Sequence, residues 1–287
     1  MAEEFAPAKV NLCLHVTGRR EDGYHLLDRL VVFANVGDTL RFEQADTFSL
    51  EITGPFAAAI EPEPDNLISR AAAQLGNLVP GAAVSLSKAL PVAAGIGGGS
   101  ADAAATLRGL LALYGIDPAE VDTLDAMALA LGADVPACLR SKALRMMGIG
   151  EQISNIQPFP PLPAVLVNPG VAVPTGPIFK ALDLAQPSTG GAGLSTLPEQ
   201  GFSSGAAVVQ WLRGQRNDLQ APAIAIAPEV GHALEALSAD QNCRLARMSG
   251  SGATCFGLFD TSDEADEFAA RLTRQQTGWW VVSTIFQ

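Results

Sequence analysis

A glycine-rich stretch over residues 91–104 is the segment of this sequence best suited to bind an anion. It reads PVAAGIGGGSADAA, with four glycines within five residues, and a helical pattern follows it. Glycine leaves the backbone open to close approach, and the first N–H groups of a helix carry partial positive charge. The pattern predicts a phosphate cradle that needs no basic side chain. The alternative is a structural turn that requires small residues.

Two common phosphate-binding loops do not fit this stretch. No Gly-Lys-Ser/Thr follows the glycines, so it is not a P-loop of the Walker type. No acidic residue ends a matching second strand about twenty residues further on, as a dinucleotide-binding fingerprint requires.

Two charged residues are candidates for proton transfer and charge neutralisation. Asp134 lies in the segment LGADVP over residues 131–136, where it either caps a short helix or acts as a base. Lys9 lies in residues 8–16, whose alternating pattern predicts a half-buried strand with Lys9 and Asn11 on one face. Taken alone, Lys9 would be a solvated surface lysine.

Hydrophobic spacing predicts the elements that hold these residues in the N-terminal half. We expect strands at 30–33 and 39–42 around a turn at Gly37-Asp38, and another turn at Asp22-Gly23. Three helices are expected, and their ranges are 65–75 with Asp65 as cap and Gly76 as stop, 101–114, and 117–132 with Gly132 just past its end.

The C-terminal half has weaker signals. The proline-rich residues 158–163 suggest a boundary, which divides the chain into domains at 1–155 and 156–287. Residues 186–205 are rich in Gly, Ser and Pro and predict a long flexible loop. Beyond the loop we expect helices at 206–211 and 229–237 and strands near 255–259 and 280–285.

Composition narrows the class of protein. The 287 residues have a formal net charge of −12, which argues against nucleic-acid or anionic-membrane partners. The four cysteines are scattered and no apolar run of membrane-spanning length occurs. We therefore expect a cytoplasmic protein, either a monomer or a weak homodimer, without a signal peptide.

Three motifs together resemble the GHMP kinases, a family of ATP-dependent small-molecule kinases. Residues 91–104 are similar to its ATP-binding motif, with Ala93 and Ala94 where members often carry glycine. Residues 6–12 (APAKVNL) resemble its first motif, and residues 247–256 (RMSGSGATCF) resemble its third, which packs against the glycine loop. The resemblance implies an α+β fold of two domains with the active site in the cleft between them.

The resemblance also implies the roles of particular residues. Asp134 would accept the proton of the substrate hydroxyl, with Lys9 beside it to keep the carboxylate ionised and offset developing charge. ATP would be bound with Mg²⁺, for which Ser100 is the one candidate ligand. The nearby carboxylate of Asp102 would repel the phosphates unless it turned away or a metal ion intervened. The implied ATP-binding residues are Asn66, Pro91, Val92, Ala93, Ala94, Gly95, Ile96, Gly97, Gly98, Gly99, Ser100 and Ala101.

Two further segments resemble one branch of the family, whose substrate is a diphosphocytidyl sugar alcohol on the non-mevalonate route to isoprenoid precursors. They are GRREDGYH over 18–25 and NPGVAVPTGPIF over 168–179. The resemblance implies phosphorylation of the 2-hydroxyl of that alcohol, with the cytosine ring between Tyr24 and Phe179 and its edge on His25. The full set of implied substrate residues is Asn11, Tyr24, His25, Thr175 and Phe179.

Two alternatives stay open. One is another GHMP kinase with a plain alcohol substrate, against which the two branch segments argue. The other is a non-catalytic nucleotide-binding module, against which the presence of both Lys9 and Asp134 argues.

Overall fold

The computed structural model describes residues 1–60, 66–182, 184, 187–188 and 191–287. The chain forms two compact units that are interleaved along the sequence. The first contains residues 1–9, 36–92 and 97–141, and the second contains 10–35, 93–96 and 142–287. Strands β1 (Ala2–Arg19) and β2 (His25–Gln44) each contribute to both units. The division at residues 155 and 156 stays a prediction about domain organisation.

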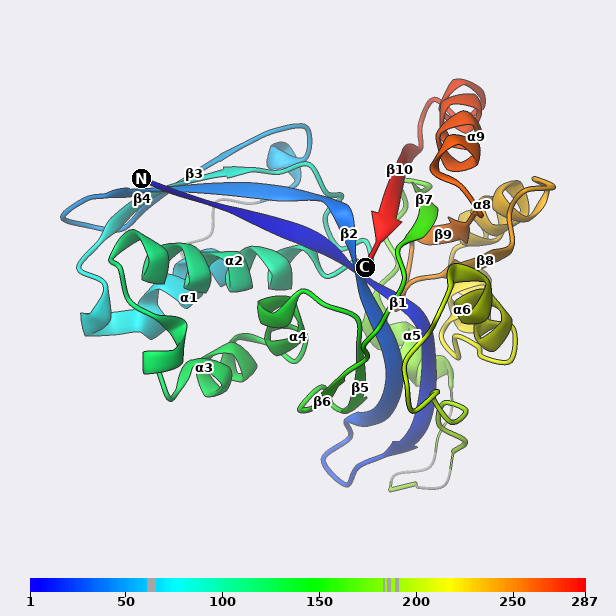
Figure 1. Ribbon diagram of the computed structural model, residues 1–287, viewed down its shortest axis with the longest axis horizontal. Helices are drawn as coiled ribbons and strands as arrows, with labels where there is room; N and C mark the ends of the chain where they lie inside the picture. Colours follow the sequence, from blue (N-terminus) through cyan, green and yellow to red (C-terminus); the bar gives the residue numbers. More distant parts are fainter. Residues whose placement is uncertain (61–65, 183, 185–186, 189–190) are drawn as a thin grey trace. The chain divides into compact units, whose positions relative to one another are not determined.

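The first unit is a layer of helices on a small sheet. The second half of β2 pairs antiparallel with β4 (Ala82–Ser87), and β4 pairs parallel with β3 (Ser49–Thr53). Helix α2 packs against α1 and α4, and α3 packs against α1 and α4 (Figure 1). A Cβ on Gly109 of α2 would lie 2.2 Å from the Phe42 ring of β2, so glycine is required for this close approach of helix and sheet. The helix bounds are α1 Leu67–Leu75, α2 Gly98–Leu113, α3 Leu124–Leu131 and α4 Val135–Arg140.

The predicted helices of this unit are present with different boundaries. The cap of α1 is Asn66, whose side chain accepts a hydrogen bond from the Ser69 N–H, while the expected cap Asp65 lies outside the described residues. Helix α2 begins three residues before the expected position 101. The expected helix over 117–132 is a 3₁₀ turn, Pro118–Glu120, followed by α3.

The predicted strands at 30–33 and 39–42 belong to one continuous strand, and the turn expected at Gly37-Asp38 is wrong. Gly37 is needed within β2 because a Cβ there would lie 2.3 Å from the carbonyl oxygen of Ala6. Asp38 is fully buried within β2, and its charge is compensated there by an ion pair with Lys88. The half-buried face expected for residues 8–16 is also wrong, since Lys9, Asn11 and their neighbours are buried on both faces of β1.

The second unit is built on an antiparallel sheet in the order β2-β10-β7-β9-β8. Strand β10 pairs with β7 from Trp280↔Asn168 to Phe286↔Leu162, and β5 joins β2 to β6. Helix α9 packs on β10 and β7, and α8 packs on β8 and β9. The strands are β5 Leu144–Gly148, β6 Gln152–Asn155, β7 Leu162–Asn168, β8 Leu245–Met248, β9 Cys255–Leu258 and β10 Trp280–Phe286. The helices are α5 Thr175–Ala181, α6 Gly205–Leu212, α7 Gln220–Ile226, α8 Glu229–Ser238 and α9 Ser262–Gln275.

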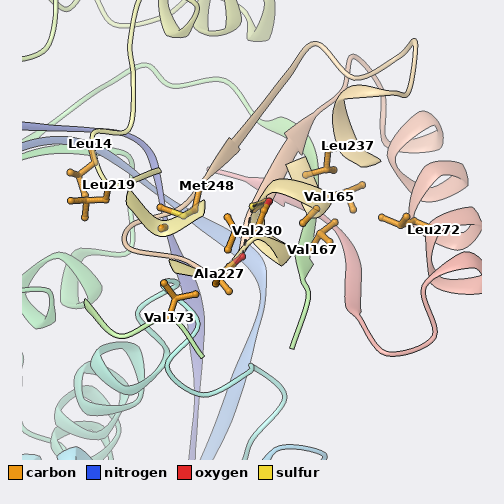
Figure 2. Close-up of a cluster of buried hydrophobic side chains, with 14 of the residues drawn as sticks. Leu14, Val165, Val167, Val173, Leu219, Ala227, Val230, Leu237, Met248 and Leu272 are labelled. Carbon is orange, nitrogen blue, oxygen red and sulfur yellow. Dashed lines mark hydrogen bonds between the residues drawn. The ribbon is translucent and has the colours of Figure 1, made fainter. Parts of the chain in front are cut away.

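Apolar side chains of these elements form one core cluster in the second unit (Figure 2). Val165 and Val167 of β7 meet Val230 and Leu237 of α8, and Leu272 of α9 joins them. The predicted helices at 206–211 and 229–237 and strands near 255–259 and 280–285 are confirmed as α6, α8, β9 and β10. Within the described parts of the chain, none of the helices has both the length and the apolar character that a bilayer crossing needs.

Candidate active site

Lys9 and Asp134 meet in the first unit. The Lys9 ammonium donates a hydrogen bond to Asp134 Oδ2 at 2.7 Å, with the Lys9 side chain 3% exposed and the Asp134 side chain 27% exposed. Asp134 stands at the N-cap of α4, yet in the described structure its side chain makes no capping hydrogen bond. The capping alternative for Asp134 is therefore wrong, because its carboxylate is committed to a buried cation and remains partly open to solvent.

The start of α2 lies against Lys9. Gly97 has a left-handed backbone (φ 61°), and a Cβ there would lie 3.1 Å from Lys9 Cβ. The helix begins with the Ala101 N–H donating to the Gly97 carbonyl at 2.9 Å. The N–H groups before Ala101 have no partner within the helix by geometry, and the helix dipole adds partial positive charge at that end. The predicted anion cradle thus opens beside the Lys9–Asp134 pair.

The Asp102 side chain is buried in the first unit, where it has a cationic partner. Lys88 donates to Asp102 Oδ2 at 2.7 Å and to Asp38 Oδ2 at 2.6 Å, and all three side chains are buried. Burial raises the pKa of Asp102 to about 7, while Lys88 acts to lower it. Burial acts to lower the pKa of Lys88, but the two carboxylates outweigh it and raise that pKa. The Asp102 carboxylate therefore pairs with a buried ammonium that it shares with Asp38.

Residues 93–96 of the glycine loop belong to the second unit, where the third motif contacts them. Ser249 accepts a hydrogen bond from the Asn11 N–H at 3.1 Å and donates one to the Gly95 carbonyl at 2.9 Å. The Thr254 N–H donates to the Ala94 carbonyl at 3.1 Å. A Cβ on Gly95 would lie 2.6 Å from the Gly252 carbonyl oxygen. These contacts confirm that the third motif packs against the glycine loop.

Ala93 has a backbone conformation that favours glycine. Its φ is 52°, in the left-handed region that costs a residue with a Cβ roughly 1–2 kcal/mol. Pro91, Ala94 and Ile96 are buried and anchor the loop, whereas Val92 and Ala93 are exposed.

His25 and Phe179 form a ring pair in the second unit. Their centroids are 4.6 Å apart at an interplanar angle of 26°. Within the described residues, His25 Nε2 is buried without a hydrogen-bond partner. Burial, and then the charge of Arg19, lowers the pKa of His25. Tyr24, by contrast, is 63% exposed, so the structure brings His25 and Phe179 together and leaves Tyr24 at the surface.

Thr175 opens α5, the helix that carries Phe179. Its hydroxyl lies 2.9 Å from the hydroxyl of Ser251, which connects the 168–179 segment to the third motif. Asn66 caps α1, so its side-chain oxygen already accepts a hydrogen bond within the helix. Its place near an adenine stays a prediction.

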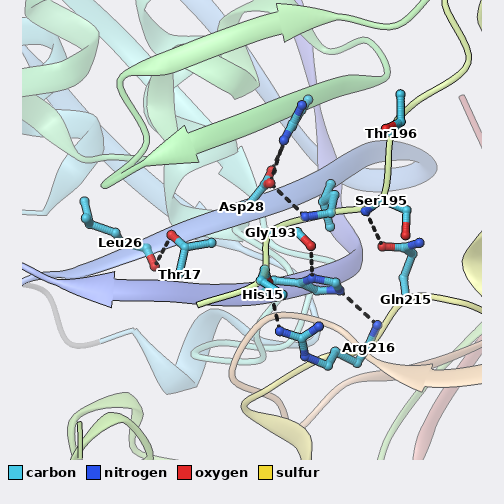
Figure 3. A network of polar contacts seen from close by, with 12 residues as sticks. His15, Thr17, Leu26, Asp28, Gly193, Ser195, Thr196, Gln215 and Arg216 are labelled. Carbon is cyan, nitrogen blue, oxygen red and sulfur yellow. Dashed lines mark hydrogen bonds and ion pairs between the residues drawn. The ribbon is translucent and has the colours of Figure 1, made fainter. Parts of the chain in front are cut away.

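A polar network around β1 and β2 escaped the sequence analysis (Figure 3). His15 Nδ1 lies 2.9 Å from the Gly193 carbonyl, and its Nε2 accepts from the Arg216 N–H at 3.1 Å. Asp28 accepts from the Leu194 N–H at 2.9 Å and pairs with Arg145. Residues 191–196 are thereby tied to the strands, although composition had predicted a flexible loop. The only sequence signal was the presence of charged residues inside apolar strands.

The comparisons with known proteins agree with this geometry. Residues 66–142 match the family model of the GHMP kinases N terminal domain, and residues 206–277 match that of the GHMP kinases C terminal domain. A homoserine kinase from Cytophaga hutchinsonii superposes with a TM-score of 0.65 at 20% identity, over 99% of this chain and 94% of its own, which shows a shared fold. The fold and the site define a two-domain α+β kinase, and the chain belongs to the GHMP kinase family.

Its most informative relatives belong to one branch. The 4-diphosphocytidyl-2-C-methyl-D-erythritol kinase of Paramagnetospirillum magneticum is 50% identical over 279 residues, covering 96% of this chain and 95% of the relative. That of Cereibacter sphaeroides (strain ATCC 17025) is 51% identical over 284 residues, covering 98% of each. A crystal structure of 4-(cytidine 5'-diphospho)-2C-methyl-D-erythritol kinase superposes with a TM-score of 0.78 at 35% identity, over 99% of this chain and 98% of that one. Within the GHMP kinases, the chain falls in this branch.

Proposed function

We propose that this protein transfers the γ-phosphoryl group of ATP to the 2-hydroxyl of 4-diphosphocytidyl-2-C-methyl-D-erythritol, giving the 2-phosphate and ADP on the non-mevalonate route to isoprenoid precursors. One observation carries the proposal. In a chain about half identical to kinases of that name, a buried ammonium and a half-open carboxylate, Lys9 and Asp134, meet beside the start of a glycine-led helix.

The catalytic residues divide the work of a phosphoryl transfer. The substrate hydroxyl loses its proton to the Asp134 carboxylate as its oxygen bonds to the γ-phosphorus, and the bond to the ADP oxygen breaks. The Lys9 ammonium, already 2.7 Å from Asp134, keeps that carboxylate ionised and offsets negative charge on the transferring group.

ATP is bound in this proposal by the residues of the glycine loop, 91–101, and by Asn66 near its adenine. Backbone N–H groups at the start of α2 face its phosphates, which suits a chain with a net charge of −12. Mg²⁺ usually keeps several waters and binds through substrate phosphates. The described residues hold no cluster of three or more His, Cys, Asp or Glu suited to a metal. They fit a Mg²⁺ carried on the nucleotide with the Ser100 hydroxyl as a ligand, which would offset phosphate charge.

The cytidyl group of the substrate is recognised by the aromatic pair. Phe179 offers a face for stacking, and the buried Nε2 of His25 offers a hydrogen bond to a base edge. Tyr24, exposed on the same hairpin as His25, closes over the other face of the ring. Asn11 and Thr175 bind the remainder of the substrate.

The proposal extends to the location, oligomeric state and partners of the enzyme. We infer a cytoplasmic enzyme, a monomer or weak homodimer, with ATP and its small-molecule substrate as partners and no nucleic acid.

A panel of nucleotides and acceptors tests the proposal. ADP release is measured with ATP alone, with ATP and the cytidyl substrate, and with ATP and the same sugar alcohol without its cytidyl group. We expect ADP release only in the condition that contains both ATP and the cytidyl substrate. Equal release with the plain alcohol would indicate another GHMP kinase, and binding of ATP without release under any condition would indicate a nucleotide-binding module.

A further inference from the structure

One arginine of the first unit links the three elements that converge on the candidate site. Lys9 comes from β1, Asp134 immediately precedes α4, and Gly97 stands at the start of α2. Arg108 lies further along α2, and its side chain donates hydrogen bonds to both β1 and α4. The proposed reaction assigns no role to this guanidinium.

Arg108 makes hydrogen bonds to three different residues. Its Nε donates to the Glu4 carboxylate at 2.8 Å, its Nη2 to the Phe5 carbonyl at 3.1 Å, and its Nη1 to the Cys138 carbonyl at 3.1 Å. The first two partners belong to β1 and the third belongs to α4. A guanidinium is planar and its donors form a rigid fork, so each partner is fixed in place relative to the other two.

Helix α4 depends on contacts of this kind for its position. It is 6 residues long, shorter than a helix that is stable by itself in water. Cys138 is near its end, where carbonyl groups have no partner inside the helix. Arg108 and the Ser141 hydroxyl donate to this carbonyl, and the guanidinium adds a positive charge that the C-terminal end of a helix favours. Asp134 is four residues earlier, roughly 6 Å along the helix, so the contact also restrains the residue that carries the carboxylate.

The other two contacts restrain β1 at a distance from the site. Glu4 and Phe5 precede Lys9 by five and four residues, which is roughly 13–17 Å along an extended strand. The Lys9 side chain is only 3% exposed, so a shift of the strand would carry the enclosed ammonium with it. A shift of β1 relative to α4 would therefore lengthen the 2.7 Å contact between Lys9 and Asp134.

We propose that Arg108 is a positioning residue of the kinase, which fixes β1 against α4 and so holds Lys9 in contact with Asp134. The inference rests on the proposed function, because it takes that pair to act in phosphoryl transfer. The start of α2 is held by its own hydrogen bond, from the Ala101 N–H to the Gly97 carbonyl. Loss of the Arg108 contacts should therefore slow the transfer and leave ATP binding nearly unchanged.

Arg108→Met tests the inference, because methionine keeps an apolar stem and removes all the donors. The rate of phosphoryl transfer is measured in a single turnover, with saturating ATP and enzyme in excess over the cytidyl substrate, so that product release does not obscure the chemical step. Arg41→Met is the matched control. Arg41 of β2 pairs with Glu3 of β1, next to Glu4, and within the described residues it makes no hydrogen bond to α4.

The single-turnover rate of Arg108→Met should fall by roughly ten- to hundredfold, because a displacement of about 1 Å between reacting groups has an effect of that order. The affinities for ATP and the cytidyl substrate should hardly change, and Arg41→Met should match the wild type. In an Asp134→Asn background the loss caused by Arg108→Met should be much smaller, because alignment no longer assists proton transfer. A merely structural defect would instead multiply the two losses.

A wild-type rate in Arg108→Met, or losses that multiply in the double variant, would overturn the inference. If thermal unfolding shows that Arg108→Met does not fold, Arg108→Lys decides by the same measurements. Lysine keeps the charge, but its single ammonium cannot reproduce the fork that joins β1 to α4. If the wild type transfers phosphate to no acceptor, or Asp134→Asn keeps the full rate, the proposed function or its base fails and this inference with it. An impaired Asp134→Asn beside an unimpaired Arg108→Met refutes this inference alone.

Discussion

Lys9 and Asp134 are 125 residues apart in the chain, and their charged atoms are 2.7 Å apart in space. The lysine comes from the first strand and the aspartate from the residue that precedes α4. A buried pair of this kind contributes little net stability, because desolvation offsets most of the attraction. Its unequal exposure suits the proposed chemistry, since the cation is enclosed while the carboxylate stays partly open to solvent.

Asp134→Asn should lower the turnover number by about 10²–10⁴-fold, the usual worth of general-base catalysis. Asparagine keeps the shape of the side chain but cannot accept the proton. ATP affinity should barely change, because the proposed phosphate site is the glycine loop. Steady-state ADP release and ATP titration give the two quantities. Asp125→Asn, which removes an exposed carboxylate of the same unit, should leave both unchanged. Full turnover by Asp134→Asn would refute the role of this residue.

Gly97→Ala should impair ATP binding and turnover together. Its φ of 61° is strained for alanine, and the new Cβ would press on Lys9 at 3.1 Å. Gly115→Ala is the matched control, because Gly115 has a similar φ of +67° but open space around its Cβ position. Both variants should lose roughly 1–2 kcal/mol of stability from backbone strain.

Thermal unfolding, ATP titration and ADP release separate the two effects of these glycine substitutions. Only Gly97→Ala should lose nucleotide affinity and rate beyond what its loss of stability explains. Equal behaviour of the two variants would mean that the glycine loop is a structural turn.

Sequence patterns predicted correctly those elements whose structure depends on residues close together in the chain. The helices expected at 206–211 and 229–237 are present as α6 and α8, and the glycine run before a helix located the start of α2 to within three residues. The same kind of pattern was misleading at Gly37-Asp38, where residue types common in turns instead contact residues that are distant in the sequence. Gly37 makes room for Ala6, and Asp38 pairs with Lys88, which lies 50 residues further on.

In the candidate site, too, contacts between residues distant in the sequence could not be predicted from local patterns. Resemblance to the family identified Lys9 and Asp134, whose predicted proximity the structure confirms. Nothing local indicated that His15 would contact Gly193, 178 residues away, or that Asp28 would hold Leu194, 166 residues away. The partner of Asp102 was equally hidden, because it depends on a strand and a helix meeting around Lys88.

Phe179→Ala should weaken binding of the cytidyl substrate by roughly 1–3 kcal/mol, the usual worth of a base stacked on an aromatic ring. Tyr24→Ala should do the same if its exposed ring closes over the other face. The double variant should lose less than the sum, because a base released on one face moves off the other. ATP affinity should not change.

Phe159→Ala is the control for the aromatic pair, since Phe159 packs edge-on against Phe202 in the same unit. Substrate titration of these variants and the wild type provides the measurement. Unchanged affinity in Phe179→Ala would remove the cytidyl assignment and leave the family assignment intact.

Affinity for the cytidyl substrate should fall as pH decreases, through titration of His25. Burial and then Arg19 lower the pKa of this residue, so the ring is neutral at pH about 7 and protonates only below the ordinary histidine range. The neutral ring fits the base, and an added proton on the partly buried ring costs desolvation and repels Arg19. Affinity should therefore be constant above the ordinary histidine pKa and decline as pH falls through the lowered pKa of His25.

His25→Gln retains an amide that can reach the base edge but does not titrate in this range. Substrate titrations of both proteins between pH about 5 and 8 should show the decline in the wild type only. Protonation of the cytosine ring affects both proteins equally, so a parallel decline in His25→Gln would show that His25 is not the titrating group.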